Sequence, residues 1–452
     1  MDSKFSKGML CRNGYLTVSQ PEIKRELTVR PVENAVGIQS ASFKVFRTTT
    51  DGSLIVPKFY GLEKFGDPSR DTRGPCVECP GISFTGRLRE ATRQPEALES
   101  GLGAFREKGG GVLSLPCGFG KTTVALALSG QLKVRTMIVV HKEFLANQWI
   151  QKIKEFCPGA TIGRVQGDTF DIEKDFVIAL IQTMCQREFE KRAFDSIGLL
   201  IVDEAHHIGA PAFSQFMFKI CPRYTLGLTA TPERKDGLTR LLYWFLGPEF
   251  FRAERSCQIT TRVSALKYTH EAFKEAPPVT RFGKINMAEM INILVDIPDR
   301  NALIVREVLG ACKDGRRVLV LSDRRSHCLY LQDKFGSKSG LYIGGMKESE
   351  LEESSKRPIV IATFQLAHEG LDIPALDTVV LSTPKSDIKQ SIGRIMRETP
   401  GKVNAPLIID IVDQWSVFFS MYGKRSAVYR ELGFDTGEPP AGPVKGYCMV
   451  QI

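Results

Sequence analysis

Short runs of three to five apolar residues recur along most of the chain, and longer stretches with a helical period separate them. Strands that are apolar on both faces are typical of parallel sheets, and the stretches between them predict crossover helices, for example at 142–156. The runs predict strands at 111–114, 136–140, 176–180, 199–202 and 225–228, and a second set at 318–321, 341–343, 359–362, 378–381 and 407–410. The sequence therefore predicts an α/β protein with two parallel sheets.

The first 85 residues follow a different pattern. Apolar and polar residues alternate at 42–47 and 54–60, which predicts short strands. The segment 67–80 is rich in Gly, Pro and charge, and its composition is typical of a linker. We therefore expect three parts: a small β-rich N-terminal domain at 1–85, a first α/β domain at 86–252 and a second at 253–452.

Composition adds modest constraints to this picture. The 452 residues are 42% hydrophobic and 25% charged, as in ordinary globular proteins, and the net charge of +10 favours a polyanionic partner without naming one. Eleven scattered cysteines indicate a reducing, intracellular setting, and Cys76 and Cys79 form a C-x-x-C without a second pair, which favours a plain loop over a zinc site. We expect a soluble protein with no membrane partner, because the start of the chain lacks an apolar signal segment and no apolar run is long enough to span a bilayer.

A glycine-rich loop lies between the first apolar run and a helical stretch. Gly118 and Gly120 let backbone N–H groups turn inward, and the helix N-terminus adds partial positive charge. Lys121 can reach the outer phosphates of a nucleoside triphosphate, and Thr122 can ligate Mg²⁺. Leu115 replaces the first Gly of the general motif G-x-x-x-x-G-K-[ST]. The expected nucleotide-binding residues are Cys117, Gly118, Phe119, Gly120, Lys121, Thr122 and Thr123.

Two acidic residues follow the apolar run at 199–202. Ligands bind at the carboxyl ends of the strands in open α/β sheets, so we expect Asp203 to hold Mg²⁺ and Glu204 to orient the attacking water. Taken alone, the pair would indicate only an acidic helix cap. Downstream of a phosphate loop it predicts hydrolysis of the nucleotide.

Further motifs resemble those of the superfamily 2 helicases. The loop form P-C-G-F-G-K-T and the string D-E-A-H are similar to that family, 229–232 reads T-A-T-P like its coupling motif, and 390–397 matches Q-x-x-G-R-x-x-R. The resemblance covers about residues 85–425. It implies two tandem RecA-like domains, of which only the first carries the phosphate loop, and it implies ATP as the nucleotide and Mg²⁺ as its ion.

The resemblance also implies roles around the nucleotide. Gln94 is the candidate reader of the adenine edge, and the alternative is a solvent-exposed helical glutamine. Arg394 and Arg397 share a helix face, and Arg397 is the expected arginine finger. The full set comprises Lys121, Asp203, Glu204, Gln390, Arg394 and Arg397 for catalysis, His206, Thr229 and Thr231 for coupling, and Gly370 and Asp372 facing the nucleotide from the second domain.

Strand-binding residues follow from the same resemblance. The stretch 141–149 is similar to a motif that touches the nucleic-acid backbone, with an amphipathic surface helix as the alternative, and 361–374 is similar to a second such motif. Grip on phosphates is weakly sequence-specific and salt-sensitive. The expected contacts are His141, Lys142, Gln182, Thr183, Arg234, Thr363 and Phe364.

The implied function is an ATP-dependent DNA helicase or translocase that remodels forked or branched DNA. The extension R-x-D-G at 234–237 is similar to the XPB-like branch, which implies 3′-to-5′ movement, and the string at 370–374 is similar to helicases of large DNA viruses and phages, some of which drive branch migration. The expected partners are DNA (single-stranded, forked or branched) and other replication, repair or transcription proteins. A viral protein of this kind would act in the host cytoplasm or nucleus, or be packaged in the virion.

Several alternatives stay open at this point. An RNA helicase is one alternative: the D-E-A-H and R-x-D-G features favour the DNA branch only modestly, since the 2′-hydroxyl decides that question at the site. A non-unwinding duplex translocase would need a partner nuclease, since no nuclease carboxylate cluster accompanies the motor. An ATP-gated binding module is a further class, disfavoured by intact Lys121, Glu204 and Arg397. The N-terminal region either recognises DNA through basic residues at 22–30 or braces the motor, and the aromatic, basic segment 418–429 either clamps a strand or docks as a helix on its own domain.

Overall fold

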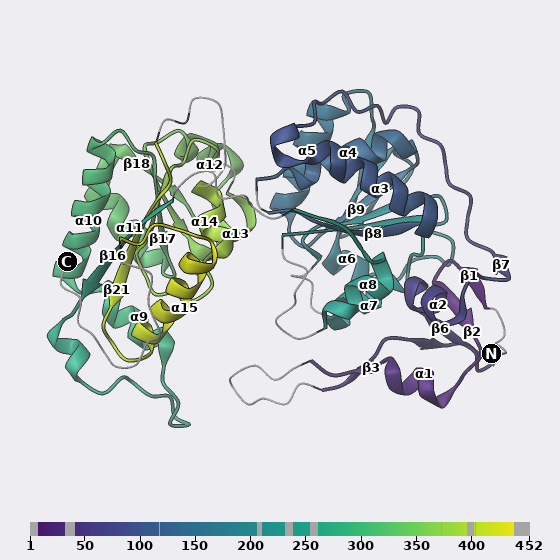
Figure 1. Ribbon diagram of the computed structural model, residues 1–452, viewed down its shortest axis with the longest axis horizontal. Helices are drawn as coiled ribbons and strands as arrows, with labels where there is room; N and C mark the ends of the chain where they lie inside the picture. The colour runs from purple at the N-terminus through teal and green to yellow at the C-terminus, as the bar shows by residue number, and fades with distance from the viewer. Residues whose placement is uncertain are drawn as a thin grey trace. The chain divides into compact units, whose positions relative to one another are not determined.

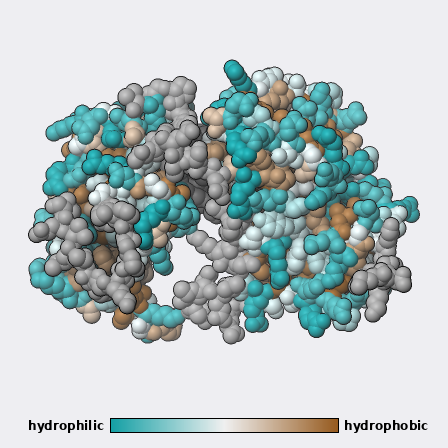
Figure 2. All heavy atoms as spheres, in the orientation of Figure 1, coloured by the Kyte–Doolittle hydropathy of each residue, from teal (hydrophilic) through white to brown (hydrophobic). Residues whose placement is uncertain are grey.

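The computed structural model describes residues 8–31, 41–116, 118–205, 210–230, 238–253, 261–371, 373–395, 402 and 404–437. The chain divides into two compact units, Met1–Arg255 and Ser256–Ile452. Each unit is built on a largely parallel sheet with helices packed on both faces (Figure 1). Hydrophilic residues predominate on the face shown in Figure 2. None of the described helices combines the length and the apolar character needed to cross a membrane.

Among the described residues, the main sheet of the first unit has eight strands in the order β11-β10-β12-β9-β13-β14-β8-β15. Neighbouring strands are parallel except β10 and β11, and the central strands are buried along their whole length, as continuous apolar runs predict. The strands are β8 (Gly110–Ser114), β9 (Thr136–Val140), β10 (Ile162–Gln166), β11 (Thr169–Phe170), β12 (Phe176–Leu180), β13 (Leu199–Val202), β14 (Tyr224–Thr229) and β15 (Glu249–Arg252).

Helices cover both faces of this sheet and make two apolar layers. On one face Leu126 and Trp149 pack in the layer under α3 (Gln94–Lys108), α4 (Lys121–Leu132) and α5 (Glu143–Phe156). On the other, Phe213 and Phe245 meet edge to face at 5.6 Å, and the layer lies under α6 (Ile181–Gln186), α7 (Ala210–Met217) and α8 (Thr239–Leu246). A short 3₁₀ helix, η1 (Glu90–Thr92), precedes α3.

The described residues between 8 and 73 form a small β-rich part of the first unit, here called the N-terminal module. Its sheet has the strand order β5-β6-β2-β1-β7, and a two-stranded pair, β3 and β4, lies beside α1. The predicted strand at 54–60 is wrong in its second half, because Pro57 ends β6 and opens helix α2. The elements are β1 (Met9–Cys11), β2 (Gly14–Thr17), α1 (Pro21–Glu26), β3 (Thr28–Val29), β4 (Phe43–Lys44), β5 (Arg47–Thr48), β6 (Leu54–Val56), α2 (Lys58–Phe65) and β7 (Arg70–Asp71).

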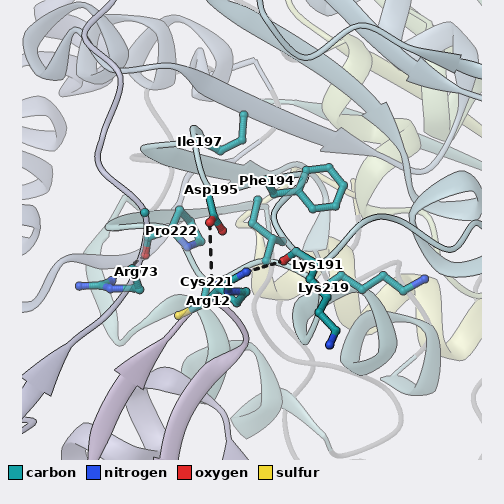
Figure 3. A pocket seen from close by; sticks show the side chains of 11 residues that line it. Arg12, Arg73, Lys191, Phe194, Asp195, Ile197, Lys219, Cys221 and Pro222 are labelled. Carbon is teal, nitrogen blue, oxygen red and sulfur yellow. Dashed lines mark hydrogen bonds and ion pairs between the residues drawn. The ribbon is translucent and has the colours of Figure 1, made fainter.

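Side chains of the N-terminal module donate to backbone carbonyls of the α/β part. Lys58 Nζ, fully buried on α2, donates to Gly109 O at 3.0 Å and to Arg223 O at 2.9 Å, and its burial lowers the pKa of the amine to about 7. Arg73 and Arg12 line a small pocket at the same junction (Figure 3), and Arg12 donates to Lys191 O there. The module is thus packed into the first unit, which favours a bracing role, while DNA recognition by its basic residues stays a prediction.

The sheet of the second unit is wholly parallel, with six strands in the order β16-β21-β20-β17-β19-β18 in the part of the chain that the structure describes. Buried ion pairs join Arg300 to Asp413 at 2.7 Å and Arg425 to Asp410 at 2.8 Å, one on each face of this sheet. The strands are β16 (Arg262–Tyr268), β17 (Val318–Ser322), β18 (Ser339–Tyr342), β19 (Ile359–Thr363), β20 (Thr378–Leu381) and β21 (Leu407–Asp413).

Helices flank this sheet too. The segment 418–429 belongs to a helix in which Phe418 and Tyr429 are buried and the Tyr429 hydroxyl donates to Asp410 Oδ2, so the docked-helix alternative is the one that holds. The elements are η3 (Glu271–Lys274), α9 (Met287–Val295), α10 (Pro298–Lys313), α11 (Arg325–Phe335), η4 (Gly336–Lys338), α12 (Glu348–Ser355), α13 (Phe364–Gly370), α14 (Lys389–Ile395) and α15 (Val417–Glu431).

Candidate nucleotide-binding and hydrolysis site

Three strands that lie side by side bring the predicted ATP-site motifs to one edge of the first sheet. In the strand order, β14 lies between β13 and β8 and is parallel to both. Their carboxyl ends therefore meet, and each is followed by a motif, the phosphate loop after β8, Thr229 at the end of β14, and Asp203-Glu204 after β13. The backbone N–H of Leu115 donates to Thr229 O at 3.0 Å, which ties the phosphate loop to the coupling motif.

The phosphate loop has the backbone shape that its glycines predict. Gly118 and Gly120 have φ of 88° and 85°, in the left-handed region, and α4 begins at Lys121. A Cβ added at Gly120 would lie 2.4 Å from Gln94 Nε2, so only glycine fits there. Thr122 and Thr123 lie in the first turn of α4, partly buried.

Gln94 holds this loop from behind. The side chain is fully buried, its Oε1 accepts the backbone N–H of Arg89 at 2.9 Å, and its Nε2 donates to Phe119 O at 2.8 Å. Arg89 also donates to Gly118 O at 3.1 Å. The solvent-exposed alternative for Gln94 is wrong. A role in adenine recognition stays a prediction, and the amide meanwhile positions the phosphate loop.

Lys121 and Glu204 face each other across the site. Lys121 Nζ donates to Glu204 Oε1 at 2.8 Å, and the side chains are 12% and 20% exposed. Glu204 also has a φ of 45°, an uncommon backbone conformation for a residue with a side chain, and such strain clusters at functional sites. In this arrangement a bound phosphate would compete with Glu204 for the Lys121 ammonium, and an attacking water would compete with Lys121 for the Glu204 carboxylate.

Asp203 is fixed more tightly than its neighbour. Its Oδ2 accepts a hydrogen bond from Trp149 Nε1 at 2.8 Å, and its Oδ1 accepts the backbone N–H of Glu204 at 2.9 Å. The side chain is 8% exposed, and burial together with the charge of Glu204 raises the pKa of Asp203 to about 6, while Lys121 opposes the rise. A buried carboxylate in this environment gains from a nearby divalent cation.

The oxygen donors present suit Mg²⁺. Mg²⁺ is typically held by one or two protein oxygens together with nucleotide phosphates, and Asp203 and the Thr122 hydroxyl are donors of that kind. Within the described residues, no group of three or more His, Cys, Asp or Glu side chains is placed to hold a metal by itself. Mg²⁺ bound here would therefore depend on the nucleotide.

The predicted strand-binding residues divide into accessible and buried ones. Lys142 precedes α5, and the exposed Gln182 donates to His141 O at 2.9 Å, so the two predicted strand-binding stretches of the first unit are joined. Thr183 is 9% exposed, and its hydroxyl accepts the N–H of Gly167 at 3.0 Å. In the second unit Thr363 ends β19.

One of these expectations needs correction. The Phe364 ring is 1% exposed and lies in the core of the second unit. An aromatic ring in the core cannot stack on a base, so the expected nucleic-acid contact of this side chain is wrong. Phe364 directly follows Thr363 in the chain, but adjacency in sequence does not determine which way its ring points.

The remaining predicted residues are described incompletely. Gly370 ends α13, and Gln390 and Arg394 lie on α14, although their side chains are not described. The residues Cys117, His206, Thr231, Arg234, Asp372 and Arg397 lie outside the described residues.

Sequence reasoning missed two residues that shape the site, Trp149 and Arg89. Trp149 lies in the stretch 141–149, for which the sequence predicts nucleic-acid contact, and Arg89 belongs to none of the motifs. A buried indole N–H needs a partner, which was a usable signal for Trp149, but no pattern in the sequence names Asp203 as that partner.

Comparisons with known proteins agree with this geometry. Residues 87–234 match the family model "Type III restriction enzyme, res subunit", and 300–399 match "Helicase conserved C-terminal domain". A protein of Acanthamoeba polyphaga mimivirus, provisionally named an ATP-dependent RNA helicase (L396), is 35% identical over 408 residues, which are 87% of this chain and 78% of the relative. A protein of African swine fever virus (isolate Pig/Kenya/KEN-50/1950), with the same provisional activity in its name (QP509L), is 23% identical over 391 residues, 80% of this chain and 75% of the relative.

A solved structure shares the fold. The ATP-dependent Type ISP restriction-modification enzyme LlaBIII bound to DNA matches 77% of this chain with a TM-score of 0.52 and 16% sequence identity. The match covers 30% of that longer chain. The likeness supports two tandem RecA-like domains in the present chain.

Proposed function

We propose, because this chain belongs to the superfamily 2 helicases and is similar to those of large DNA viruses, that it couples ATP hydrolysis to movement along DNA. The proposal of ATP hydrolysis rests on one observation: Lys121, Asp203 and Glu204 lie together at one edge of the sheet. The proposed substrates are single-stranded, forked or branched DNA. The protein would work in viral replication, recombination, repair or transcription.

The ion pair between Lys121 and Glu204 suggests how ATP switches the site on. The inward N–H groups of the phosphate loop and the Lys121 ammonium would bind the β- and γ-phosphates. Lys121 would then leave Glu204 for the phosphates, since a phosphate carries more charge than a carboxylate. Glu204, released from Lys121, would accept a proton from the attacking water and orient it in line with the γ-phosphate.

Other residues complete this cycle. Mg²⁺, when bound with ATP at Asp203 and Thr122, supplies charge neutralisation to the phosphates. Arg394 and Arg397 of the second unit are proposed to stabilise the charge on the γ-phosphate in the transition state. Thr229, bonded through its carbonyl to the phosphate loop, would report the state of the nucleotide to the strand-binding residues.

Two observations favour DNA over RNA as the substrate, and one favours RNA. The resemblance of 229–237 to the DNA-directed XPB-like branch and a structural neighbour solved with DNA favour DNA. The provisional names of the mimivirus and African swine fever virus proteins favour RNA, and an RNA helicase is therefore the second candidate. A base or phosphate contact does not distinguish the two, because the 2′-hydroxyl makes the difference.

The test is an ATPase assay with no nucleic acid, single-stranded DNA, forked DNA and RNA, comparing the wild type with Glu204→Gln. We expect DNA to stimulate hydrolysis at least tenfold and Glu204→Gln to abolish it, by about 10²-fold or more, because the water loses its base. Glu96→Gln is the matched control, since Glu96 is 56% exposed on α3 and pairs only with Arg93 among the described contacts. Stimulation by RNA alone would favour the RNA helicase, and hydrolysis that survives Glu204→Gln would contradict the assigned role.

A further inference from the structure

A small hairpin in the second unit carries an exposed aromatic tip. Residues 278–286, here called the tip hairpin, lie between η3 and α9 and project from the body of the unit (Figure 1). Thr280 N donates to Lys284 O at 2.7 Å, Asn286 N donates to Pro278 O at 2.7 Å, and Val279 pairs antiparallel with Ile285. The turn between the two arms consists of Arg281, Phe282 and Gly283, with Gly283 at a φ of 71°.

Exposed apolar surface is concentrated on this hairpin. Phe282 is 73% exposed, Val279 60% and Ile285 38%. Of the seven large hydrophobic side chains exposed in the described residues, these are three, so the hairpin is not an ordinary scatter of single exposed residues. An aromatic ring held at the tip of a hydrogen-bonded hairpin presents its face to any ligand at low cost in side-chain entropy.

The charge around Phe282 indicates which ligand fits. The Arg281 guanidinium lies 4.7 Å from the Phe282 ring centroid, and Lys284, the first residue after the turn, is exposed. No Asp or Glu occurs between 276 and 288. Aromatic faces flanked by cations stack nucleic-acid bases and neutralise the neighbouring phosphates, whereas an apolar protein partner would gain nothing from the cations.

The tip hairpin also follows the edge of the second unit's sheet at which β19 ends with Thr363. The chain enters it from the carboxyl end of β16, and β19 ends at Thr363 on the same edge because the strands are parallel. Four strand spacings separate β16 from β19, roughly 19 Å at about 4.8 Å each. This spacing separates the carboxyl ends of the two strands, and the tip hairpin follows the carboxyl end of β16 after a connecting segment that includes η3.

We propose that the tip hairpin stacks Phe282 on a base of the bound strand, with Arg281 and Lys284 on the adjacent phosphates, and that this stacking separates the strands of a duplex as the motor moves. The inference rests on the proposed function, since it needs a nucleic-acid strand to be bound. It assigns a strand-separating role to a segment without any nucleotide chemistry of its own.

Binding is tested without ATP by fluorescence of Phe282→Trp titrated with a DNA oligonucleotide, after subtraction of the wild-type signal from the native tryptophans. Stacking on a base is expected to quench the added indole at the same oligonucleotide concentration at which fluorescence anisotropy shows binding. The matched control is Tyr330→Trp, because Tyr330 is also exposed (40%) and also carries a cation, Lys334 Nζ at 5.2 Å from its ring, but lies on α11. Equal quenching of both, or of neither while the oligonucleotide binds, would overturn the proposal.

Strand separation is tested with Phe282→Ala, Phe282→Tyr and Tyr330→Ala. We expect Phe282→Ala to unwind forked DNA about tenfold more slowly and Phe282→Tyr to restore unwinding, while DNA-stimulated ATPase stays within twofold in every variant. Unwinding that is unchanged in Phe282→Ala, or that falls only in step with ATPase, would overturn the proposal while leaving the motor intact. A wild type that binds no nucleic acid would overturn both the hairpin and the proposed function.

Discussion

The side chains proposed for hydrolysis depend for their positions on neighbouring residues that have no proposed role in the reaction. Asp203 is an example, because both its oxygens are already bonded to the protein, one of them to the indole of Trp149, which is 2% exposed. A buried carboxylate with a raised pKa would turn or take up a proton if that bond were lost. Trp149 therefore positions Asp203, the proposed Mg²⁺ ligand.

Replacing Trp149 by Phe tests this at the scale of one bond. Phe keeps most of the buried ring but removes the donor to Asp203 Oδ2, so we expect the half-saturating Mg²⁺ concentration for binding of a fluorescent ATP analogue to rise about tenfold. Trp244→Phe is the control, because the Trp244 ring packs on Tyr60 at 5.4 Å, away from the acidic pair. An unchanged Mg²⁺ dependence, or the same rise in the control, would exclude the positioning role.

Single residues also mark how far sequence reasoning reaches. The glycines and Lys121 were predictable because a phosphate loop allows few alternatives in backbone shape. The embedding of Gln94 behind the loop and of Phe364 in the core was not, since both depend on contacts between residues distant in the chain or on the direction of one side chain. The sequence names residue types for a role, and packing decides which way each side chain points.

Whole elements were predicted better than side chains. All ten apolar runs form strands, because a strand buried on both faces has no polar position to disguise it. The strands that escaped notice are those such as β10, β15 and β16, which alternate burial or lie at a sheet edge and resemble ordinary mixed sequence. At 54–57 a short apolar run ends as a strand before Pro57 and a helix follows, and the pattern of apolar residues alone does not mark this change.

His327 shows how elements of the second unit are joined. It lies on α11, is 2% exposed, and its ring nitrogens bond Ser322 Oγ at the end of β17 and Asn301 Oδ1 on α10, both at 3.0 Å. Asn301 donates its amide to Val295 O, so its oxygen accepts the Nε2–H of the ring. Burial, and to a lesser degree the charge of Arg300, lowers the pKa of His327 to about 3.

This junction predicts a loss of stability in acid. The unfolded chain protonates His327 below about pH 6.5 and the folded chain only near pH 3, so the stability of the folded state falls as pH drops through that window, by about 2 kcal/mol at pH 5. His327→Gln removes this contribution. The difference in the free energy of unfolding between the wild type and the variant should therefore be smaller at pH 5 than at pH 7.5, by about that amount. Urea unfolding at both values measures it, and a pH-independent difference would contradict the neutral, buried assignment.

For the whole molecule, the two units contribute different parts of one proposed motor. The first unit holds the phosphate loop and the acidic pair, and within the described residues the second unit has no comparable glycine loop. The second unit holds Thr363 at the end of β19, the tip hairpin after β16, and α14, which includes Arg394. In the proposed mechanism, hydrolysis coupled to movement needs both sets.

Arg397→Ala tests that division of labour. A group that acts on the transition state is expected to lower kcat of the DNA-stimulated ATPase by about 10³-fold and to change the affinity for ATP only a few-fold, since the ground-state phosphates are held by the first unit. Lys389→Ala is the matched control, because Lys389 is a cation of α14 whose Nζ is already bonded to Glu431 at 2.7 Å. If Arg397→Ala weakened ATP binding as much as it slowed hydrolysis, the residue would be a ground-state ligand, and if it did neither, the first unit would hydrolyse ATP without help from the second.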